Sequence, residues 1–331
     1  ILGNGYTLDA AREGRALYTN HTPHVTVREL TVTRGQGGQQ PGGACCGGLY
    51  VFGGHLDILD SVLTGNWTAP TGDAAAAAAQ TLRMVGSTVT HNVALDDTGG
   101  ITAAEVVVVD STISDNEARG YRGDGAGIVG AHVTVVNSTI EGNRLTDGRG
   151  GPGGGGIRAT TSIMLDHATV VGNSAPAGKA DNVAISPGGD TASFHSTASV
   201  VARGDLNCVM DLGLTPSHSS SYSYDDDGSC GFVGVGDTSN GADPMLAALA
   251  DNGGPTWTML PDLATSPLVD GVASAECTLA VDQRGVWRPQ GTGCDIGAVE
   301  VERDDPGGFV TGGGWFRSEP GAYTPEHAVE G

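Results

Sequence analysis

One short phrase returns five times between residues 59 and 173, and it limits the folds that this chain can adopt. Each copy runs from a small residue through an alternating apolar stretch to an asparagine: Ser61 to Asn66, Ser87 to Asn92, Ser111 to Asn116, Ser138 to Asn143 and Ala168 to Asn173. The closing asparagines lie 26, 24, 27 and 30 residues apart, and a period of roughly 20–50 residues is typical of a solenoid. Glycine-rich motifs before Leu49, Ile101, Ile128 and Ile157 follow the same period. The repeat therefore indicates stacked, equivalent turns.

The residues within each period favour strands. Short β-branched runs such as Val106–Val109 and His132–Val136 alternate with glycine or asparagine, and no window keeps an apolar face of helical period. Three short strands in about 26 residues make one rung of a β-helix, in which each strand pairs with its equivalent one rung away. The sequence predicts an all-β, right-handed, single-stranded parallel β-helix. The expected inward stack is Leu63, Val89, Ile113, Ile140 and Val170.

The repeated asparagines have a structural interpretation. Asparagine is one of the few non-glycine residues that tolerate the left-handed conformation of a tight turn, and its amide can bond the asparagines of adjacent rungs. We therefore expect a structural ladder rather than a ligand site at Asn66, Asn92, Asn116, Asn143 and Asn173.

The overall composition excludes several classes of function. The chain has 38 Asp and Glu against 16 Lys and Arg, a formal net charge of −22, and such acidity argues against nucleic acid or anionic lipid as a partner. The chain has no run of about 18 apolar residues, so the sequence predicts no membrane-spanning segment. Residues 1–10 carry no export signal and look like the middle of a rung, so a mature chain or a fragment is expected.

Six cysteines suggest the compartment. Cys208 with Cys230 and Cys277 with Cys294 are spaced for local disulfides, and none of the spacings resembles a zinc site. Adjacent Cys45 and Cys46 leave two alternatives, a bond to each other or a bond to another chain. Disulfides favour an oxidising environment, so we expect an extracellular or cell-surface location.

The chain divides into three expected regions. Residues 1–205 hold the rungs, residues 206–300 hold the last rungs with their disulfides and a C-terminal cap, and residues 301–331 form an acidic linker and tail. Excursions at residues 35–43, 67–73 and 144–153 each lie between the asparagine of one rung and the glycines of the next, so they are expected to project from one corner, where a solenoid would place recognition.

The C-terminal region carries a family resemblance. Its motifs are Asp251-Asn-Gly-Gly-Pro255, Ser266-Pro267, Asp282-Gln-Arg-Gly285, Arg288-Pro289 and Asp295-Ile-Gly-Ala298. Together they resemble the end of bacterial extracellular right-handed parallel β-helix proteins, the group often labelled choice-of-anchor Q, and the repeats are similar to those of polymorphic outer membrane proteins, a class of surface adhesins. The resemblance implies a secreted or surface-displayed pectin-lyase-like fold, usually with no demonstrated enzyme activity. Independently, Arg284 and Arg288 are expected to pair with Asp282 and Asp295 and to lock the final rung.

Two functional hypotheses follow. The first is a structural or adhesive protein without a catalytic residue, cofactor or metal site, whose partner is a surface glycan, a surface protein or itself. The second is a polysaccharide lyase or glycoside hydrolase, for which Asp96-Asp97 is the most suggestive carboxylate pair. Metal sites at His21 and His24, or calcium at Asp225–Asp227, have weaker support than ordinary surface roles.

The two ends suggest self-assembly. An open β-helix end offers unpaired strand edges, and residues 1–8 are expected to form one. Near the other end, Trp315 and Phe316 belong to a tail too short to bury its own apolar residues. We therefore hypothesise head-to-tail stacking into an extracellular filament, with these two residues bridging to the next subunit.

Overall fold

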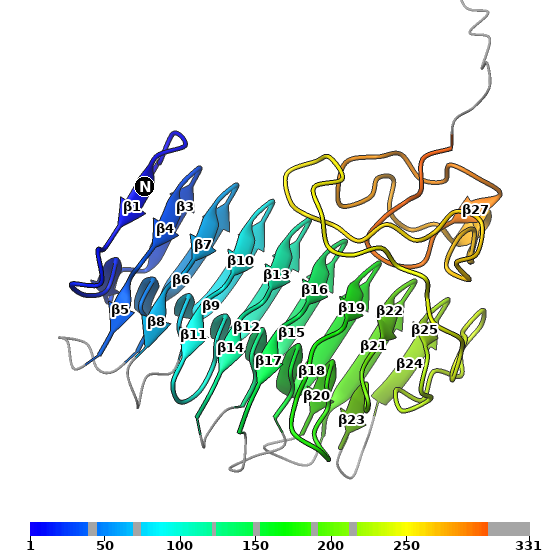
Figure 1. The fold of residues 1–331 in the computed structure, drawn as a ribbon, viewed down its shortest axis with the longest axis horizontal. Coiled ribbons are helices and arrows are strands. Elements are labelled where there is room, and N and C mark those ends of the chain that lie inside the picture. Colours follow the sequence, from blue (N-terminus) through cyan, green and yellow to red (C-terminus); the bar gives the residue numbers. More distant parts are fainter. Residues whose placement is uncertain are drawn as a thin grey trace, which may run out of the picture.

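The chain folds into a parallel β-solenoid of about seven turns with about 27 residues each (Figure 1). The computed structural model describes residues 1–38, 45–68, 74–120, 124–147, 153–186, 191–211 and 217–303. Within these ranges the only helical element is the 3₁₀ turn η1 (Ser274–Glu276), and no helix there has the length and apolar character needed to span a membrane. The prediction of an all-β parallel solenoid is confirmed.

Three parallel sheets form the sides of the solenoid. The nine-stranded sheet contains, in pairing order, β1 (Thr7–Asp9), β4 (Thr31–Thr33), β7 (Val62–Thr64), β10 (Thr88–Thr90), β13 (Thr112–Ser114), β16 (Thr139–Glu141), β19 (Thr169–Val171), β22 (Val200–Ala202) and β25 (Tyr224–Asp225). The five-stranded sheet contains β5 (Gln36–Gly37), β8 (Trp67–Thr68), β11 (Val93–Ala94), β14 (Glu117–Ala118) and β17 (Arg144–Leu145).

The third sheet has eleven strands, several of them long. They are β2 (Leu17–Asn20), β3 (His24–Arg28), β6 (Leu49–Leu59), β9 (Ala77–Val85), β12 (Ile101–Val109), β15 (Ile128–Val136), β18 (Ile157–Asp166), β20 (Val183–Ile185), β21 (Ser193–Thr197), β23 (Cys208–Met210) and β24 (Ser217–Ser221). Outside the solenoid, β26 (Val272–Ala273) and β27 (Gly293–Cys294) form an antiparallel pair.

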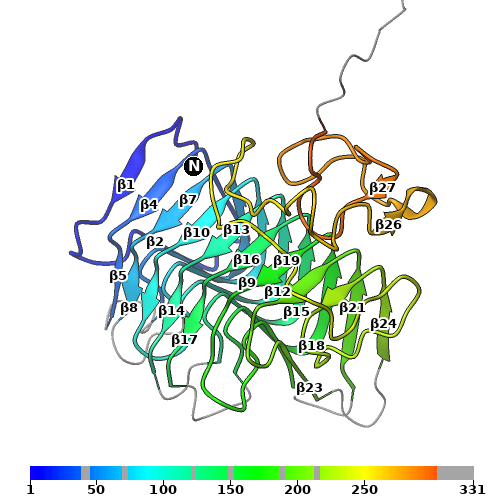
Figure 2. The same ribbon diagram turned by 45° about the vertical axis from the view of Figure 1, so that its right-hand side comes forward.

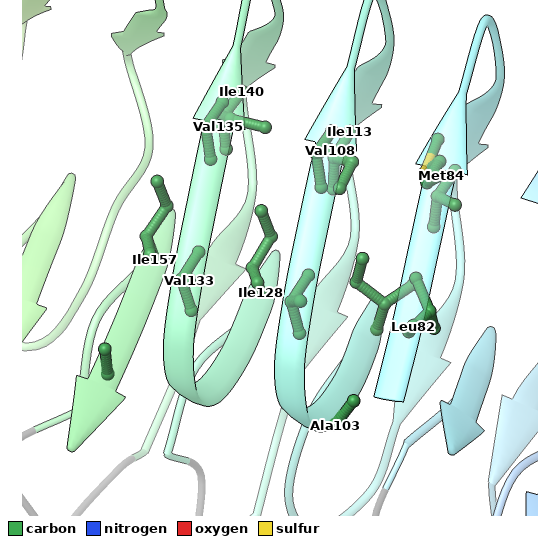
Figure 3. Close-up of a cluster of buried hydrophobic side chains, with 14 of the residues drawn as sticks. Leu82, Met84, Ala103, Val108, Ile113, Ile128, Val133, Val135, Ile140 and Ile157 are labelled. Carbon is green, nitrogen blue, oxygen red and sulfur yellow. The ribbon is translucent and has the colours of Figure 1, made fainter. Parts of the chain in front are cut away.

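A narrow aliphatic core runs along the axis. Successive residues of a strand point to opposite faces, so each three-residue strand of the nine-stranded sheet sends its middle residue inward. The predicted inward residues Leu63, Val89, Ile113, Ile140 and Val170 are all fully buried. They belong to one cluster with Met84, Val108 and Val135 of the eleven-stranded sheet. Figure 3 shows Ile113 beside Val108 and Ile140 beside Val135. Burying each aliphatic side chain stabilises the fold by about 1.5–3 kcal/mol.

The asparagine ladder forms as predicted and is longer than predicted. From Asn66 to Asn173, each side-chain Nδ2 donates to Oδ1 of the next asparagine at 2.9 Å. The series then continues through Asn182 at 2.8 Å and Asn207 at 2.7 Å. These two stand at the starts of β20 and β23, in register with the glycines that precede earlier strands. Because every member is buried, each amide would cost free energy if it were left without its partners.

The left-handed turn lies one residue before each ladder asparagine. Positive φ values occur at Gly65, His91, Asp115, Gly142 and Gly172. The prediction that the asparagines themselves take this conformation is therefore wrong by one residue. The physical reason is that the ladder side chain is buried against the next rung, so the preceding residue turns the chain and directs its own side chain elsewhere.

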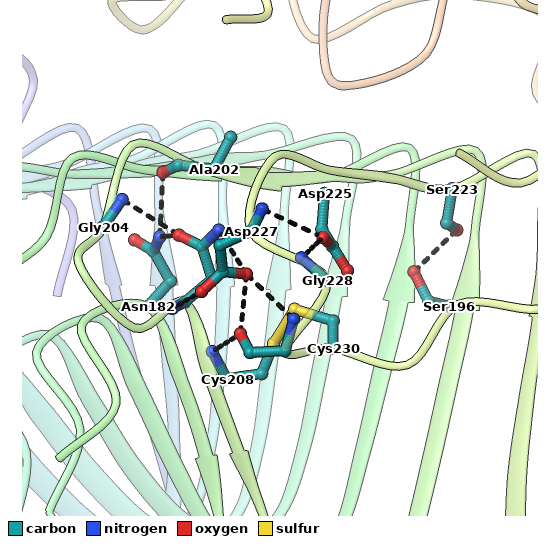
Figure 4. The surroundings of a disulfide bond; sticks show 12 residues. Asn182, Ser196, Ala202, Gly204, Cys208, Ser223, Asp225, Asp227, Gly228 and Cys230 are labelled. Atoms are coloured by element: carbon teal, nitrogen blue, oxygen red, sulfur yellow. Dashed lines mark hydrogen bonds between the residues drawn. A yellow bond between two sulfur atoms is a disulfide. The ribbon is translucent and has the colours of Figure 1, made fainter. Parts of the chain in front are cut away.

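The ladder ends on carboxylates. Asn207 Nδ2 donates to Asp226 at 2.7 Å and to Asp227 at 3.0 Å. Asp225 accepts hydrogen bonds from the backbone N–H groups of Asp227 and Gly228 (Figure 4). The acidic cluster considered for calcium thus supplies the acceptors that finish the ladder.

Residues 243–303 fold back along the outer face of the nine-stranded sheet (Figures 1 and 2). Gln283 Nε2 donates to Thr112 Oγ1 at 3.0 Å, and Gln283 Oε1 accepts from Thr139 Oγ1 at 2.7 Å. A second apolar cluster joins Leu268 and Ile296 of this segment to Val200 and other residues of the last rungs. The segment therefore packs against the side of the solenoid instead of closing its end.

A buried ionic network organises this segment. Arg284 pairs with Asp282 at 2.9 Å, as predicted. Arg288 pairs with Glu300 at 3.1 Å and reaches Asp295 through that residue's backbone carbonyl. The prediction of Asp295 as its ionic partner is wrong, because the Asp295 carboxylate accepts the N–H groups of Asp270 and Val301.

All six cysteines are paired within the chain. Cys208 bonds Cys230 and Cys277 bonds Cys294, as the spacing indicated. Cys45 bonds Cys46, so of the two alternatives for this pair the structure has the bond between neighbours. With both sulfur atoms in that bond, neither residue is left to link covalently to another chain.

Candidate functional site

A groove lies where residues 249–257 pass over the outer face of the nine-stranded sheet. Its floor consists of the outward-facing residues of β10 and β13, Thr88, Thr90, Thr112 and Ser114. These hydroxyls flank Val89 and Ile113, whose side chains point inward. Thr90 Oγ1 and Ser114 Oγ lie 3.0 Å apart, and Val62 of β7 adds an apolar side chain to the lining.

The C-terminal segment supplies the wall. Leu249, Pro255, Thr256 and Trp257 line the groove, which has a volume of about 330 Å³. Thr112 Oγ1 donates to the Trp257 carbonyl at 2.6 Å, and this bond fixes the backbone at the groove. The Trp257 residue remains 56% exposed. A large aromatic residue is thus held at the groove wall while much of its surface stays open to solvent.

Charged groups gather at one side of the groove. His91 and Asp115 occupy two successive left-handed turns, and His91 Nε2 lies 4.0 Å from Asp115 Oδ2. Glu141 is in register with Ser114, one rung further along. Burial, together with the negative charge of Asp115, raises the pKa of Glu141 to about 7. Near neutral pH this carboxyl is therefore divided between its protonated and ionised forms.

The groove suits a ligand with hydroxyl groups and an apolar face. Hydroxyl side chains both donate and accept hydrogen bonds, and an exposed indole offers a flat apolar surface with a polar N–H. A volume of this size falls within the range of about 300–1,000 Å³ common for small-molecule sites. A short stretch of carbohydrate has the matching chemistry.

The structure places the predicted site residues elsewhere. Asp96 and Asp97 follow β11 beyond the five-stranded sheet and do not line the groove. His21 packs edge-on against Phe52, whereas His24 meets His55 and Asp57. The three predicted recognition loops begin in the five-stranded sheet at β5, β8 and β17, and their central residues 39–44, 69–73 and 148–152 lie outside the described ranges. Trp315 and Phe316 also lie outside them.

Comparisons with known proteins gave no match: no protein-family model fits the chain, and no curated protein or solved structure is significantly similar to it. The resemblance to bacterial extracellular β-helix proteins and surface adhesins therefore stays a prediction.

Proposed function

We propose that this protein is an extracellular or cell-surface adhesive protein that binds neutral glycan in the groove beside Trp257, without catalysis. The observation that carries the proposal is an exposed tryptophan beside a groove whose floor includes the partly exposed Thr88 and Thr90. The net charge of −22 and the nearby Asp115 and Glu141 disfavour acidic polysaccharides by repulsion. The resemblance to surface adhesins, drawn from the repeats, agrees with this function.

Truncating the aromatic wall tests the proposal. We expect Trp257→Ala to weaken binding of a neutral oligosaccharide roughly tenfold to a hundredfold, because loss of an aromatic anchor typically costs about 2 kcal/mol or more. A glycan array would identify the oligosaccharide, and titration calorimetry would measure its affinity. Trp287→Ala is the matched control, since Trp287 is exposed in the same segment but does not line the groove. Equal affinities of the two variants would remove the groove from the proposal.

Catalysis is the second candidate, and Glu141 is the observation that favours it. A carboxylic acid with a pKa near 7 beside a second carboxylate has the properties of a general acid paired with an ionised partner. The same purified protein should be incubated with pectin, alginate and neutral polysaccharides, and release of new chain ends measured. Turnover that disappears in Glu141→Gln or Asp115→Asn would replace the adhesive proposal by an enzymatic one. Asp96→Asn and Asp97→Asn test the carboxylate pair suggested by the sequence.

The end faces give a further reason to propose self-association. Ile1, Leu2 and Tyr6 are exposed at the first turn, and Val233 and Val235 are exposed beyond the last one. Among the described strands β1 pairs only with β4, so it has one open edge, whereas residues 1–3 bond to Thr26 and Arg28 along the outer edge of β3. A contact between these unlike ends would be heterologous and would propagate as a filament.

Electron microscopy tests the assembly. We expect filaments from the full chain and shorter or no filaments after removal of residues 302–331, which include Trp315 and Phe316. Single particles in both samples would contradict head-to-tail assembly. The adhesive proposal would then be supported by the groove alone.

A further inference from the structure

Two histidines and an aspartate meet on the outer face of the eleven-stranded sheet, in the first two turns. His24 of β3 pairs in register with His55 of β6, so their Cα atoms are direct neighbours across the two rungs. Asp57 lies two residues after His55 and therefore projects from the same face. The imidazole rings are 4.7 Å apart between centroids and meet edge to face.

The nitrogen and oxygen atoms of these side chains converge. His24 Nε2 lies 2.7 Å from Asp57 Oδ2, and His55 Nε2 lies 3.1 Å from Asp57 Oδ1. One ligand atom from each residue lies within 4.8 Å of the other two. In a tetrahedral zinc site with bonds of about 2.0–2.1 Å, ligand atoms are separated by roughly 3.3 Å. The two histidine–aspartate separations of 2.7 and 3.1 Å are close to that spacing.

Neighbouring groups orient the cluster. His55 Nδ1 lies 2.6 Å from Thr81 Oγ1, the residue in register with His55 on the following rung. A partner on the second ring nitrogen fixes the orientation of metal-binding histidines. The register of β6 against β9 shifts between Val51 and His55, where Gly53 has a φ of 68°. Irregularities of this kind direct side chains at functional sites.

We propose that His24, His55 and Asp57 form a binding site for a divalent transition-metal ion, with Zn²⁺ as the best match. Two imidazoles and a carboxylate are ligands that Zn²⁺ accepts, and three protein ligands leave a fourth position for water. The proposal rests on this cluster alone and is independent of the groove beside Trp257. His24 is exposed, whereas the Asp57 side chain is only 15% exposed, so an ion could enter from solvent and contact a largely buried carboxylate.

The ion would join two rungs. His24 belongs to the first turn, while His55 and Asp57 belong to the second. On the side away from β6, β3 is paired with residues 1–3, which bond to Thr26 and Arg28, in place of a full strand. A metal bridge would hold β3 against β6 and would slow local opening of this end. Arg83 lies in register with Asp57 on the next rung. Its positive charge would repel the ion, but it does not bond to either histidine in the cluster.

Calorimetric titration with Zn²⁺ alone tests the site, using the full chain after treatment with a chelator at neutral pH. We expect one ion per chain, and loss of this binding in His24→Ala, His55→Ala and Asp57→Asn. Thr81→Val, which removes only the hydroxyl beside His55, should weaken binding about 10–100-fold. His132→Ala is the matched control, because His132 occupies the same row of the sheet but has Glu105 and Ser162 in register beside it instead of a second histidine. Circular dichroism verifies that each variant is folded.

Hydrogen exchange supplies a second readout. Zn²⁺ should slow exchange of backbone amides in residues 24–28 of the unmodified chain and leave those in β15 unchanged. The same experiment on His55→Ala should show no effect of the metal. Absence of Zn²⁺ binding to the unmodified chain, or binding that survives both histidine substitutions, would overturn the proposal and leave a hydrogen-bonded His–Asp–His cluster.

Discussion

Replacing Ile113 with aspartate is expected to leave the protein without a cooperatively folded solenoid. Ile113 is fully buried in β13, in register with Val89 on one side and Ile140 on the other. The substitution removes aliphatic packing, which alone costs about 2–5 kcal/mol, and adds a carboxyl group with no partner in the core. The sum approaches the whole stability of a typical domain, about 5–15 kcal/mol.

Circular dichroism and urea unfolding would measure this effect, and two further variants would calibrate it. Val107→Asp introduces the same charge at an outward-facing position of β12, in register with Arg83, and should change stability by about 0.5 kcal/mol or less. Ile113→Val should cost about 0.5–1.5 kcal/mol. A cooperative transition of normal midpoint in Ile113→Asp would contradict the assignment of Ile113 to the core.

Replacing Arg288 with methionine is expected to detach the C-terminal segment from the solenoid at low denaturant concentration. The Arg288 side chain is fully buried, pairs with Glu300, and donates to the carbonyls of Asp295 and Gly297. Removing one member of a buried ion pair leaves the other charge uncompensated and typically costs about 3–5 kcal/mol. Tryptophan fluorescence during urea unfolding would detect the release, because Trp257 and Trp287 both belong to this segment.

Two control variants separate the buried charge from the loss of packing. Arg28→Met removes an exposed arginine that pairs with Asp60 and should cost about 1 kcal/mol or less. The double variant Arg288→Met with Glu300→Gln removes both charges and should recover part of the lost stability. A double variant no more stable than the single one would show that the backbone hydrogen bonds of Arg288 dominate.

The repeat was predictable because its signal is local. Each rung repeats the same residue types at the same offsets, so the spacing of asparagines from Asn66 to Asn173 indicated both the period and the ladder. Asn182 and Asn207 were not predicted as ladder residues. They stand just before β20 and β23, at positions where earlier rungs carry glycine, whereas the five predicted asparagines follow strands of the nine-stranded sheet. Register with Ile157 was the only signal that could have found them.

The groove was not predictable because its two sides are far apart in sequence. Thr112 and Trp257, which bond each other, are separated by 145 residues, and the path of the C-terminal segment over the sheet is set by Gln283 and by the apolar cluster around Leu268. The cluster of His24, His55 and Asp57 was closer to prediction, since equivalent positions on adjacent rungs meet. Predicting that cluster would have required the register of β3 against β6. The sequence did not define this register, because the chain between the two strands is irregular.

The amide ladder gives the solenoid a direction. Every Nδ2 donor from Asn66 onward points to the oxygen of the following rung, so the side-chain dipoles add along the axis instead of cancelling. The series begins where the backbone N–H of Gly35 donates to Asn66 and finishes at the anions Asp226 and Asp227. Negative charge at the positive end of aligned dipoles is favourable, as it is at the N-terminus of an α-helix.

Burial acts to raise the pKa of Asp227, but hydrogen bonds from Asn207 and Ser229 outweigh it and hold the pKa below its ordinary value. A depressed carboxyl pKa contributes stability that is present above the unfolded pKa and is lost as pH falls through the folded value. Acid would therefore neutralise the terminating charge and loosen this polarised column from its last rung, while its first rung, which begins on a backbone amide, would lack that sensitivity.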